Sequence, residues 1–138
     1  MVRHDYLRNV RLNALICGAL VALSALVTPA GADTSPGIAL IRDSTKGNCS
    51  ICHLISGIGL PDDAQGNIGP SLEGVGGRLS PEELADRIAD ARRINPETVM
   101  PPYGTTEGLV DVDHRYLGRP ILTDSEIDAI VSYLFSLR

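Results

Sequence analysis

Large aromatic side chains and cysteine are scarce in this sequence. Among its 138 residues it has no tryptophan, one phenylalanine and three cysteines, whereas it has 14 glycines and 9 prolines. The apolar side chains of such a chain make a thin core, and small domains with thin cores usually need a disulfide, a metal ion or a large cofactor. We therefore expect something beyond ordinary side chains to complete the core.

An apolar run long enough to cross a membrane is also missing. Three arginines precede an apolar stretch over residues 12–27, which is shorter than the roughly 20 residues that a transmembrane helix needs. The stretch leads to Ala30 and Ala32, which have the small-x-small spacing that a signal peptidase accepts. A transmembrane anchor is the alternative, but the pattern favours a secretory signal peptide over residues 1–32, cleaved after about Ala32. Cys17 would be removed with it.

An excess of positive charge is absent as well. After cleavage, one domain remains over residues 33–138, with nine basic and sixteen acidic side chains and a formal net charge of −7. This balance argues against nucleic acid or an anionic membrane as a partner. We expect a protein of the periplasm that keeps no membrane anchor, in an oxidising compartment where paired thiols form a disulfide unless another group binds them.

The sequence has no convincing β alternation, internal repeat or low-complexity tract. Helical patterns cover residues 35–43, 79–96 and 122–138, and the stretches between them are rich in glycine and proline. In the first pattern, Ser35 is a candidate N-cap and Pro36 stands at the first helical position. The predicted fold class is all-α.

The second and third patterns each begin with a capping box, which pairs an N-cap hydroxyl with a glutamate three residues later. The boxes are Ser80 with Glu83 and Thr123 with Glu126, and the apolar stripes are Leu84, Ile88 and Ala91, and Ile127, Ile130, Val131 and Leu134. The second pattern also holds Arg87, Arg92 and Arg93. These could form a docking patch, but charges on a solvated helix face are the simpler interpretation.

The segment "GNCSICH", residues 47–53, carries the most specific motif. Two cysteines two residues apart, followed at once by a histidine, are typical of haem attachment, because both thiols add to vinyl groups on one porphyrin edge. His53 would then lie under the iron as an axial ligand. A redox dithiol is one alternative, but it needs an αβ pattern that this chain lacks. A zinc site of Cys49, Cys52, His53 and His114 is the other, although adjacent Cys52 and His53 are awkward joint ligands.

A second axial ligand is required if His53 binds haem iron. The candidates are Met100 and His114. Met100 lies among Pro96, Pro101 and Pro102, whose fixed φ angles stiffen the loop around it, so we favour this thioether over a mere packing role. His114 stands between two aspartates and is better explained as a surface histidine paired with a carboxylate.

The stretch "IGPSLEGVGGR", residues 68–78, supplies a candidate for the supporting shell of the histidine. A metal-bound histidine normally donates its second N–H to a carbonyl, which fixes the orientation of the ring. The Gly-Pro turn makes the carbonyl of Pro70 our candidate. The alternative is an ordinary glycine-rich turn.

The order of these motifs, followed by a C-terminal amphipathic helix, resembles the class I cytochromes c. The resemblance covers most of residues 33–138. It implies a small class I cytochrome c-like domain, with about three to four helices around one covalently bound haem c. It also implies thioether bonds to Cys49 and Cys52 and six-coordinate iron between His53 and Met100, which leaves no open site for a substrate.

Longer blocks are similar to the SoxX family of sulfur-oxidation cytochromes, most specifically "RRINPETVMPPYG" at residues 92–104 and "GRPILT" at residues 118–123. That resemblance implies an electron-accepting subunit of a periplasmic SoxAX complex, an S-thiosulfotransferase that couples thiosulfate oxidatively to a cysteine of a SoxYZ-like carrier. The implied partners are a SoxA-like cytochrome in a heterodimer, the carrier, and a downstream electron-acceptor cytochrome. Substrate chemistry would occur at a haem of the SoxA-like partner, so no residue here is expected to be catalytic.

A free, diffusible periplasmic cytochrome that carries electrons to a terminal oxidase or reductase is the alternative function. Residues 103–123 help to separate the two, because a segment of roughly 20 residues between ligand loop and last helix is more than a minimal shuttle needs. We interpret it as a surface for a permanent partner, with a variable surface loop as the alternative.

Overall fold

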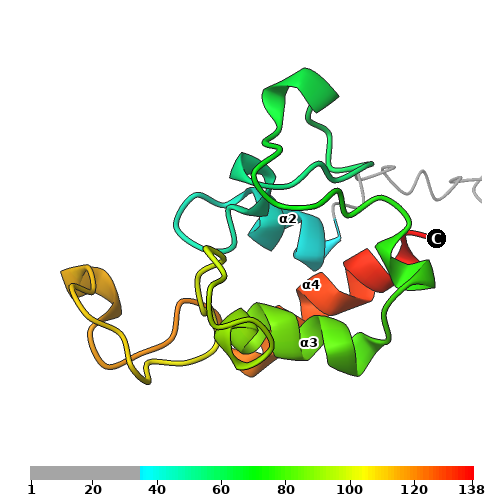
Figure 1. Cartoon of the computed structure of the whole chain (residues 1–138). Helices are drawn as coiled ribbons and strands as arrows, with labels where there is room; N and C mark the ends of the chain where they lie inside the picture. The colour runs from blue at the N-terminus through cyan, green and yellow to red at the C-terminus, as the bar shows by residue number, and fades with distance from the viewer. Residues whose placement is uncertain (1–34) are drawn as a thin grey trace, which may run out of the picture. The chain divides into compact units, whose positions relative to one another are not determined.

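Three α-helices form the frame of the computed structural model, which describes residues 35–138. They are α2 (Pro36–Arg42), α3 (Pro81–Asp90) and α4 (Asp124–Ser136), and five single-turn 3-10 helices lie in the loops between them (Figure 1). No strand occurs within residues 35–138. The prediction of a small all-α fold is therefore confirmed.

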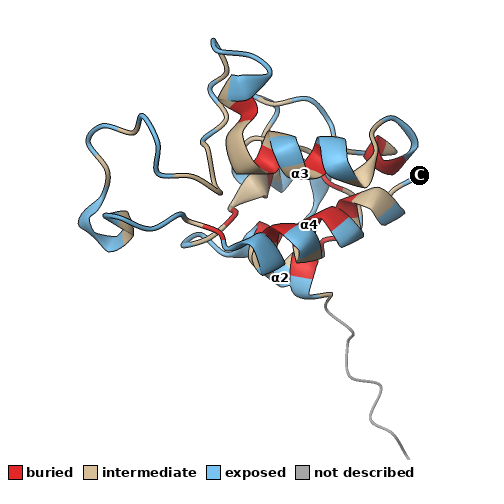
Figure 2. Ribbon diagram, turned by 90° about the horizontal axis from the view of Figure 1, so that it is seen from below, coloured by how far each residue is buried: buried red, intermediate tan, exposed pale blue. Residues whose placement is uncertain are grey.

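Helix α4 is the central element, since it packs against both α2 and α3. Its buried residues form the predicted stripe of Ile127, Ile130, Val131 and Leu134, visible in red in Figure 2. Helix α2 comes very close to α4 at Gly37, where a Cβ atom would overlap the carbonyl oxygen of Ala129 and lie 2.9 Å from Cβ of Tyr133. The absence of a side chain at Gly37 therefore sets how closely the two helices approach.

Both predicted capping boxes are present. In α3 the Ser80 hydroxyl accepts from the Glu83 N–H at 3.2 Å, and the Glu83 carboxylate accepts from the Ser80 N–H at 2.8 Å. In α4 the Thr123 hydroxyl and the Glu126 carboxylate make the same pair of bonds. Ser35 stands at the N-cap position of α2 and Pro36 is its first residue, but the Ser35 side chain makes no cap hydrogen bond.

The hydrophobic core is aliphatic throughout. The predicted stripe of α3 is buried: Leu84 and Ile88 belong to the core cluster, and Ala91 is also buried. The core cluster comprises Ile41, Ile55, Ile58, Val75, Leu84, Ile88, Leu122, Ile127, Ile130, Val131 and Leu134. Phe135 and the tyrosines Tyr103 and Tyr133 pack only at its margin. The buried cluster at the centre of the fold therefore contains no aromatic side chain.

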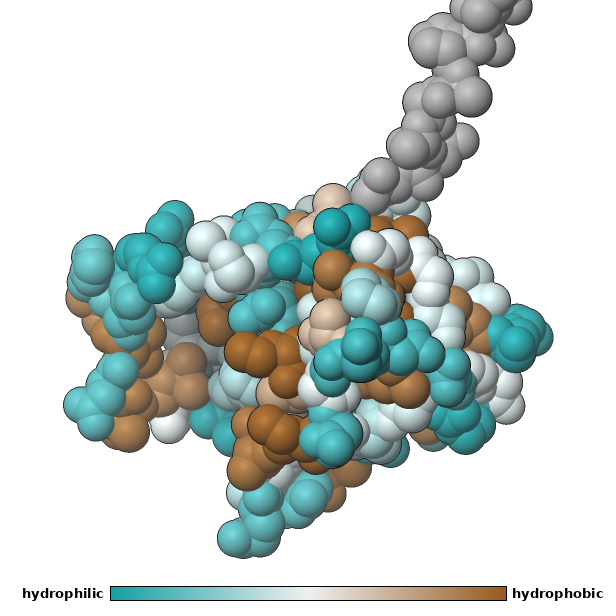
Figure 3. Space-filling view, turned by 90° about the horizontal axis from the view of Figure 1, so that it is seen from above, coloured by the Kyte–Doolittle hydropathy of each residue, from teal (hydrophilic) through white to brown (hydrophobic). Residues whose placement is uncertain are grey.

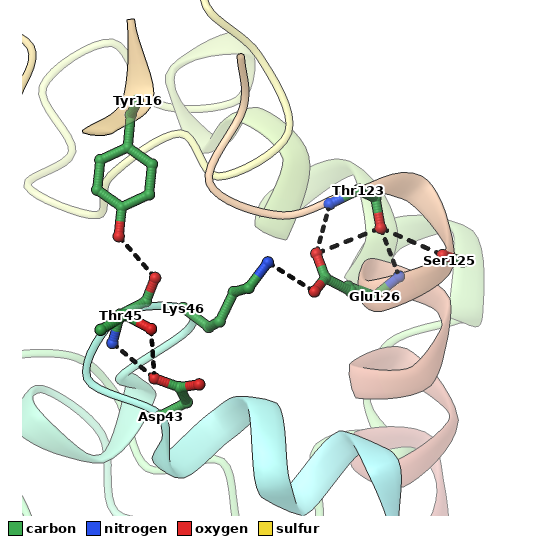
Figure 4. A network of polar contacts seen from close by, with 7 residues as sticks. All are labelled: Asp43, Thr45, Lys46, Tyr116, Thr123, Ser125 and Glu126. Carbon is green, nitrogen blue, oxygen red and sulfur yellow. Dashed lines mark hydrogen bonds and ion pairs between the residues drawn. The ribbon is translucent and has the colours of Figure 1, made fainter. Parts of the chain in front are cut away.

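Residues 105–121 form a long excursion whose ends meet, because the Leu122 N–H donates to the Tyr103 carbonyl at 2.9 Å. In Figures 1 and 2 this segment projects away from the three helices. It is tied back at Tyr116, whose hydroxyl donates to the Thr45 carbonyl at 2.6 Å (Figure 4). The excursion is therefore anchored to the loop that precedes the cysteine-histidine motif.

The described residues belong to one unit that spans residues 33–138. Within it, no helix has both the length and the apolar character needed to cross a membrane. The predicted signal peptide, with Cys17, lies outside the described residues.

Candidate functional site

A single large cavity brings together the residues that the motifs singled out. It has a volume of about 690 Å³, and Cys49, Cys52, His53 and Met100 all line it. Its walls come from the motif segment, residues 68–79, α3, the loop that follows α3, and α4, and most of its lining is apolar. This volume lies within the range of roughly 300–1,000 Å³ that is usual for ligand and cofactor sites.

The His53 ring is held in one orientation from two sides. Its Nδ1–H donates to the Pro70 carbonyl at 2.7 Å, so that Nε2 is the nitrogen left to act as a ligand in the neutral ring. Gly69 lies against the face of the ring, and a Cβ atom there would stand 2.6 Å from Nδ1 and 2.8 Å from Nε2. The Gly69 N–H in turn donates to the Cys52 carbonyl at 2.8 Å. The Gly-Pro turn thus positions an imidazole whose Nε2 is free to bind a metal.

The two cysteines do not have the character of a reactive dithiol. Burial raises the pKa of the Cys49 thiol to about 11. Redox-active cysteines need the opposite shift, because the thiolate is the nucleophile. No disulfide joins Cys49 and Cys52 in the described part of the chain. Two partly buried cysteines that line an apolar cavity suit covalent attachment of a planar apolar group better than thiol exchange.

The zinc alternative finds no support in the arrangement of the ligands. His114 lies in the excursion, its side chain is 87% exposed, and its Nδ1 lies 3.4 Å from the Asp113 carboxylate. Residues 35–138 contain no group of three or more His, Cys, Asp or Glu side chains that could hold a metal ion. His114 does not line the cavity that Cys49, Cys52 and His53 border, so it is not placed to be a fourth ligand.

Met100 is presented by a strap, residues 94–104, that is pinned to α3 and its C-terminal turn at both ends. The Asn95 N–H donates to the Ala91 carbonyl at 2.9 Å, and the Gly104 N–H donates to the Ala89 carbonyl at 3.0 Å. In the middle, the Met100 N–H donates to the Thr98 hydroxyl at 3.2 Å. These bonds and the flanking prolines hold the methionine where it lines the same cavity as His53.

Two lining residues were not expected from the sequence. Tyr103, at the end of the strap, is largely buried, and this burial raises its pKa to about 12, so the phenol stays neutral. Arg87 also lines the cavity, so the interpretation of Arg87 as a charge on a solvated helix face was wrong. Arg92 and Arg93 do not line it. No local pattern could have separated Arg87 from its neighbours, since only the position of the strap decides which arginine borders the cavity.

Hydrophobic side chains also reach the surface near the cavity. Figure 3 shows hydrophobic residues exposed among hydrophilic ones on one face of the molecule. Three of the exposed large hydrophobic side chains, Ile68, Ile94 and Val99, line the cavity, and two others, Val110 and Leu117, lie on the excursion. Both regions therefore present apolar surface that water covers in the isolated chain.

Comparison with known proteins gives two findings. The family model for cytochrome c matches residues 38–138. The structure is similar to a chain in the crystal structure of SoxXA from P. pantotrophus, with a TM-score of 0.64 and 28% sequence identity, over 80% of this chain and 85% of that one. No curated protein sequence gives a significant match. The resemblance to sulfur-oxidation cytochromes noted in the sequence is confirmed by this structural similarity.

Proposed function

The chain belongs to the cytochrome c family, and from this premise we propose that it is the single-haem, electron-accepting subunit of a periplasmic SoxXA-type complex. As a cytochrome c it carries a covalently attached haem c, which supplies a one-electron redox centre when bound. The observation that carries the proposal is the cavity itself. Cys49, Cys52, His53 and Met100 converge on it from two separate segments, with the His53 Nδ1–H already donated to a carbonyl.

The residues present fit this group well. Cys49 and Cys52 would hold it by thioether bonds, and His53 and Met100 would be its axial ligands. Pro70 orients the imidazole and strengthens it as a ligand through the hydrogen bond to Nδ1–H. The mostly apolar lining of the cavity would suit the apolar porphyrin. If His53 and Met100 both bind the iron, the group would transfer electrons and would leave no position for a substrate, so no residue is assigned a catalytic role.

Substitution of Met100 tests the axial ligand. We expect Met100→Ala to abolish the charge-transfer band from methionine sulfur to ferric iron and to lower the reduction potential, because the thioether favours ferrous iron. Val110→Ala is the control, since Val110 is 84% exposed and does not line the cavity. Absorption spectra of the oxidised proteins report the band. A Met100→Ala protein whose band is unchanged would contradict the assignment.

The partnership with a SoxA-like cytochrome is supported by two observations. The structural similarity is to a chain of a SoxXA complex. The excursion over residues 105–121 is anchored at both ends, yet it exposes Val110 and Leu117 at 84% and 67%. An exposed apolar surface on an ordered segment is typical of a protein interface. In this proposal the partner's haem performs the thiosulfate chemistry with a SoxYZ-like carrier, and this chain passes the electrons to a further cytochrome.

Isolation of the native complex tests the partnership. We expect this chain to co-purify from the periplasm with a second haem subunit, and its haem to be reduced when thiosulfate and the carrier are added. Val110→Asp combined with Leu117→Asp is expected to release the partner, whereas Ile51→Asp, at a site 63% exposed and outside residues 105–121, is not. A monomer that is indifferent to thiosulfate would favour the diffusible electron shuttle instead.

A further inference from the structure

One cationic side chain borders the cavity without a partner. Arg87 lies on α3, whose buried residues are Leu84 and Ile88. The next turn begins at Ala91, which is also buried. Its Nε atom is buried and has no hydrogen-bond partner within residues 35–138. A buried donor of a charged group that lacks a hydrogen-bond partner destabilises the folded protein. The position of Arg87 on the cavity wall points to a partner inside the cavity.

The carboxylates at helical spacing from Arg87 are engaged elsewhere. Glu83, one turn earlier, accepts from the Ser80 N–H at 2.8 Å as part of the capping box. Asp90, one turn later, accepts from Nε and Nη2 of Arg92 at 2.7 and 2.9 Å. No ion pair between Arg87 and a carboxylate occurs in the part of the chain that the structure describes. The polypeptide therefore supplies no anion for this guanidinium.

Arg78, the other arginine of the cavity wall, differs in this respect. Its Nη1 donates to the Glu73 carbonyl at 2.6 Å, and its Nη2 donates to the Ser71 carbonyl at 3.1 Å. Its guanidinium is thus already tied to the backbone of the turn that follows Pro70. Arg87 is the cavity arginine for which no such bonds are found among the described residues.

We propose that Arg87 binds a propionate carboxylate of the haem, an inference that rests on the proposed function. A haem c keeps two carboxylates that are not used in its attachment, and a guanidinium is well suited to bind one of them through two N–H groups. Arg87 then holds that propionate ionised, because a nearby opposite charge favours the charged form. Its positive charge also favours the reduced iron over the oxidised iron. Arg87 is a positioning and tuning residue, and it transfers no electron.

Other titratable or charged groups line the cavity, and their charges also contribute to the midpoint potential. They are His53, Arg78, Glu97 and Tyr103, together with Cys49 and Cys52, whose thiols are consumed on haem attachment. Tyr103 is neutral because burial raises its pKa to about 12. These groups are unchanged in an Arg87 variant, so a change in the pH profile reports the propionate.

Spectroelectrochemical titration of the haem-loaded protein from acidic to alkaline pH tests the proposal. For Arg87→Met we expect the pH-dependent step in midpoint potential to move to higher pH by about one pH unit or more. The reason is that loss of the neighbouring cation raises the pKa of the propionate. Above that step the potential should be lower than in the parent. Arg87→Lys keeps the charge and should retain most of the parent profile. Arg93→Met removes an equal charge from an exposed site and should leave the profile unchanged.

A profile for Arg87→Met that coincides with those of the parent and Arg93→Met would overturn the proposal. Retention of the methionine charge-transfer band in Arg87→Met shows that haem attachment and ligation survive, so this result separates the proposal from the proposed function. If Arg87→Met does not accumulate, Arg87→Lys decides the matter by redox-triggered infrared difference spectroscopy. A shift of the propionate carboxylate band relative to the parent supports the contact, and an unshifted band rejects it.

Discussion

At the scale of single residues, the imidazole of His53 depends on two neighbours that have no chemistry of their own. Pro70 contributes only a carbonyl oxygen, 2.7 Å from Nδ1, and Gly69 contributes only the space that a Cβ would occupy. An imidazole with one nitrogen tied to a carbonyl keeps its tautomer and its angle when the iron changes charge. The turn over residues 68–70 therefore supports the proposed iron ligand as directly as the motif that contains it.

Substitution of Gly69 by alanine is predicted to damage this arrangement. The added Cβ would overlap the His53 ring, so we expect a loss of about 1–3 kcal/mol in the free energy of unfolding and an altered ligand-field spectrum. The matched control is Gly77→Ala, because a Cβ at Gly77 would meet nothing within 4 Å. Guanidinium chloride unfolding of the haem-loaded proteins gives the comparison. Equal stability of the two variants would show that the turn accommodates the added Cβ at residue 69 without loss of stability, and would contradict the prediction.

At the scale of elements, Glu126 joins the loop before the haem motif to the start of α4. One carboxylate oxygen accepts from the Thr123 N–H at 2.9 Å, and the other pairs with Lys46 Nζ at 2.7 Å (Figure 4). Lys46 chiefly, and then the Thr123 N–H, hold the pKa of Glu126 below its usual value of 4.5. Tyr116 binds the same loop from the excursion. Three segments distant in sequence therefore meet just before Cys49.

The lowered pKa of Glu126 predicts a dependence of stability on pH. A carboxylate with a lower pKa in the folded state stabilises the protein above its unfolded pKa, near 4.5, and this contribution is lost as pH falls through the folded value. Glu126→Gln keeps the capping bonds but not the charge, so its stability should decline less than that of the parent between neutral pH and about pH 3.

Asp128→Asn is the matched control for this prediction. Asp128 lies on the same helix, and its carboxylate makes no ion pair with any residue in the described range. Denaturant unfolding at the two pH values measures the effect. A Glu126→Gln protein that loses as much stability on acidification as the parent would contradict the prediction. Asp43 and Asp90 also have lowered pKa values, so some acid sensitivity should remain in every variant.

At the scale of the whole molecule, the cofactor cavity and the hydrophobic core share the same side chains. Six of the eleven core residues also line the cavity: Val75, Leu84, Ile88, Leu122, Ile130 and Leu134. A cavity of about 690 Å³ among these residues leaves them with few contacts on one side unless a large apolar group fills it. A bound haem would therefore complete the packing of these side chains as well as supply the redox centre.

Loss of haem attachment is therefore predicted to impair folding. We expect the Cys49→Ala, Cys52→Ala double variant to show less helical circular dichroism than the parent and to unfold without a sharp transition. Ile51→Ala, an exposed site between the two cysteines, is the control and should keep both properties. Thermal unfolding followed by circular dichroism makes the test. A double variant as helical and cooperative as the parent would show that the protein core suffices.

Sequence reasoning was most successful where the pattern is local. The capping boxes at Ser80 and Thr123 and the apolar stripe of α4 were all predicted, because caps and helical faces are set by residues three or four positions apart. It failed for Arg87, whose neighbours Arg92 and Arg93 look alike in the sequence. Whether a charge is solvated depends on which distant segment lies over it.

What the sequence determined by itself is the chemistry of the site. The two cysteines and the histidine lie within residues 49–53, and their spacing is typical of attachment to a porphyrin edge. The tertiary structure decided which groups surround that chemistry. It brought Met100 and the Pro70 carbonyl to the same cavity, kept His114 outside it, and left Arg87 beside it without an anion. The physical reason is that a hydrogen bond or an ion pair acts over a few ångströms, so partners far apart in sequence are known only once the chain has folded.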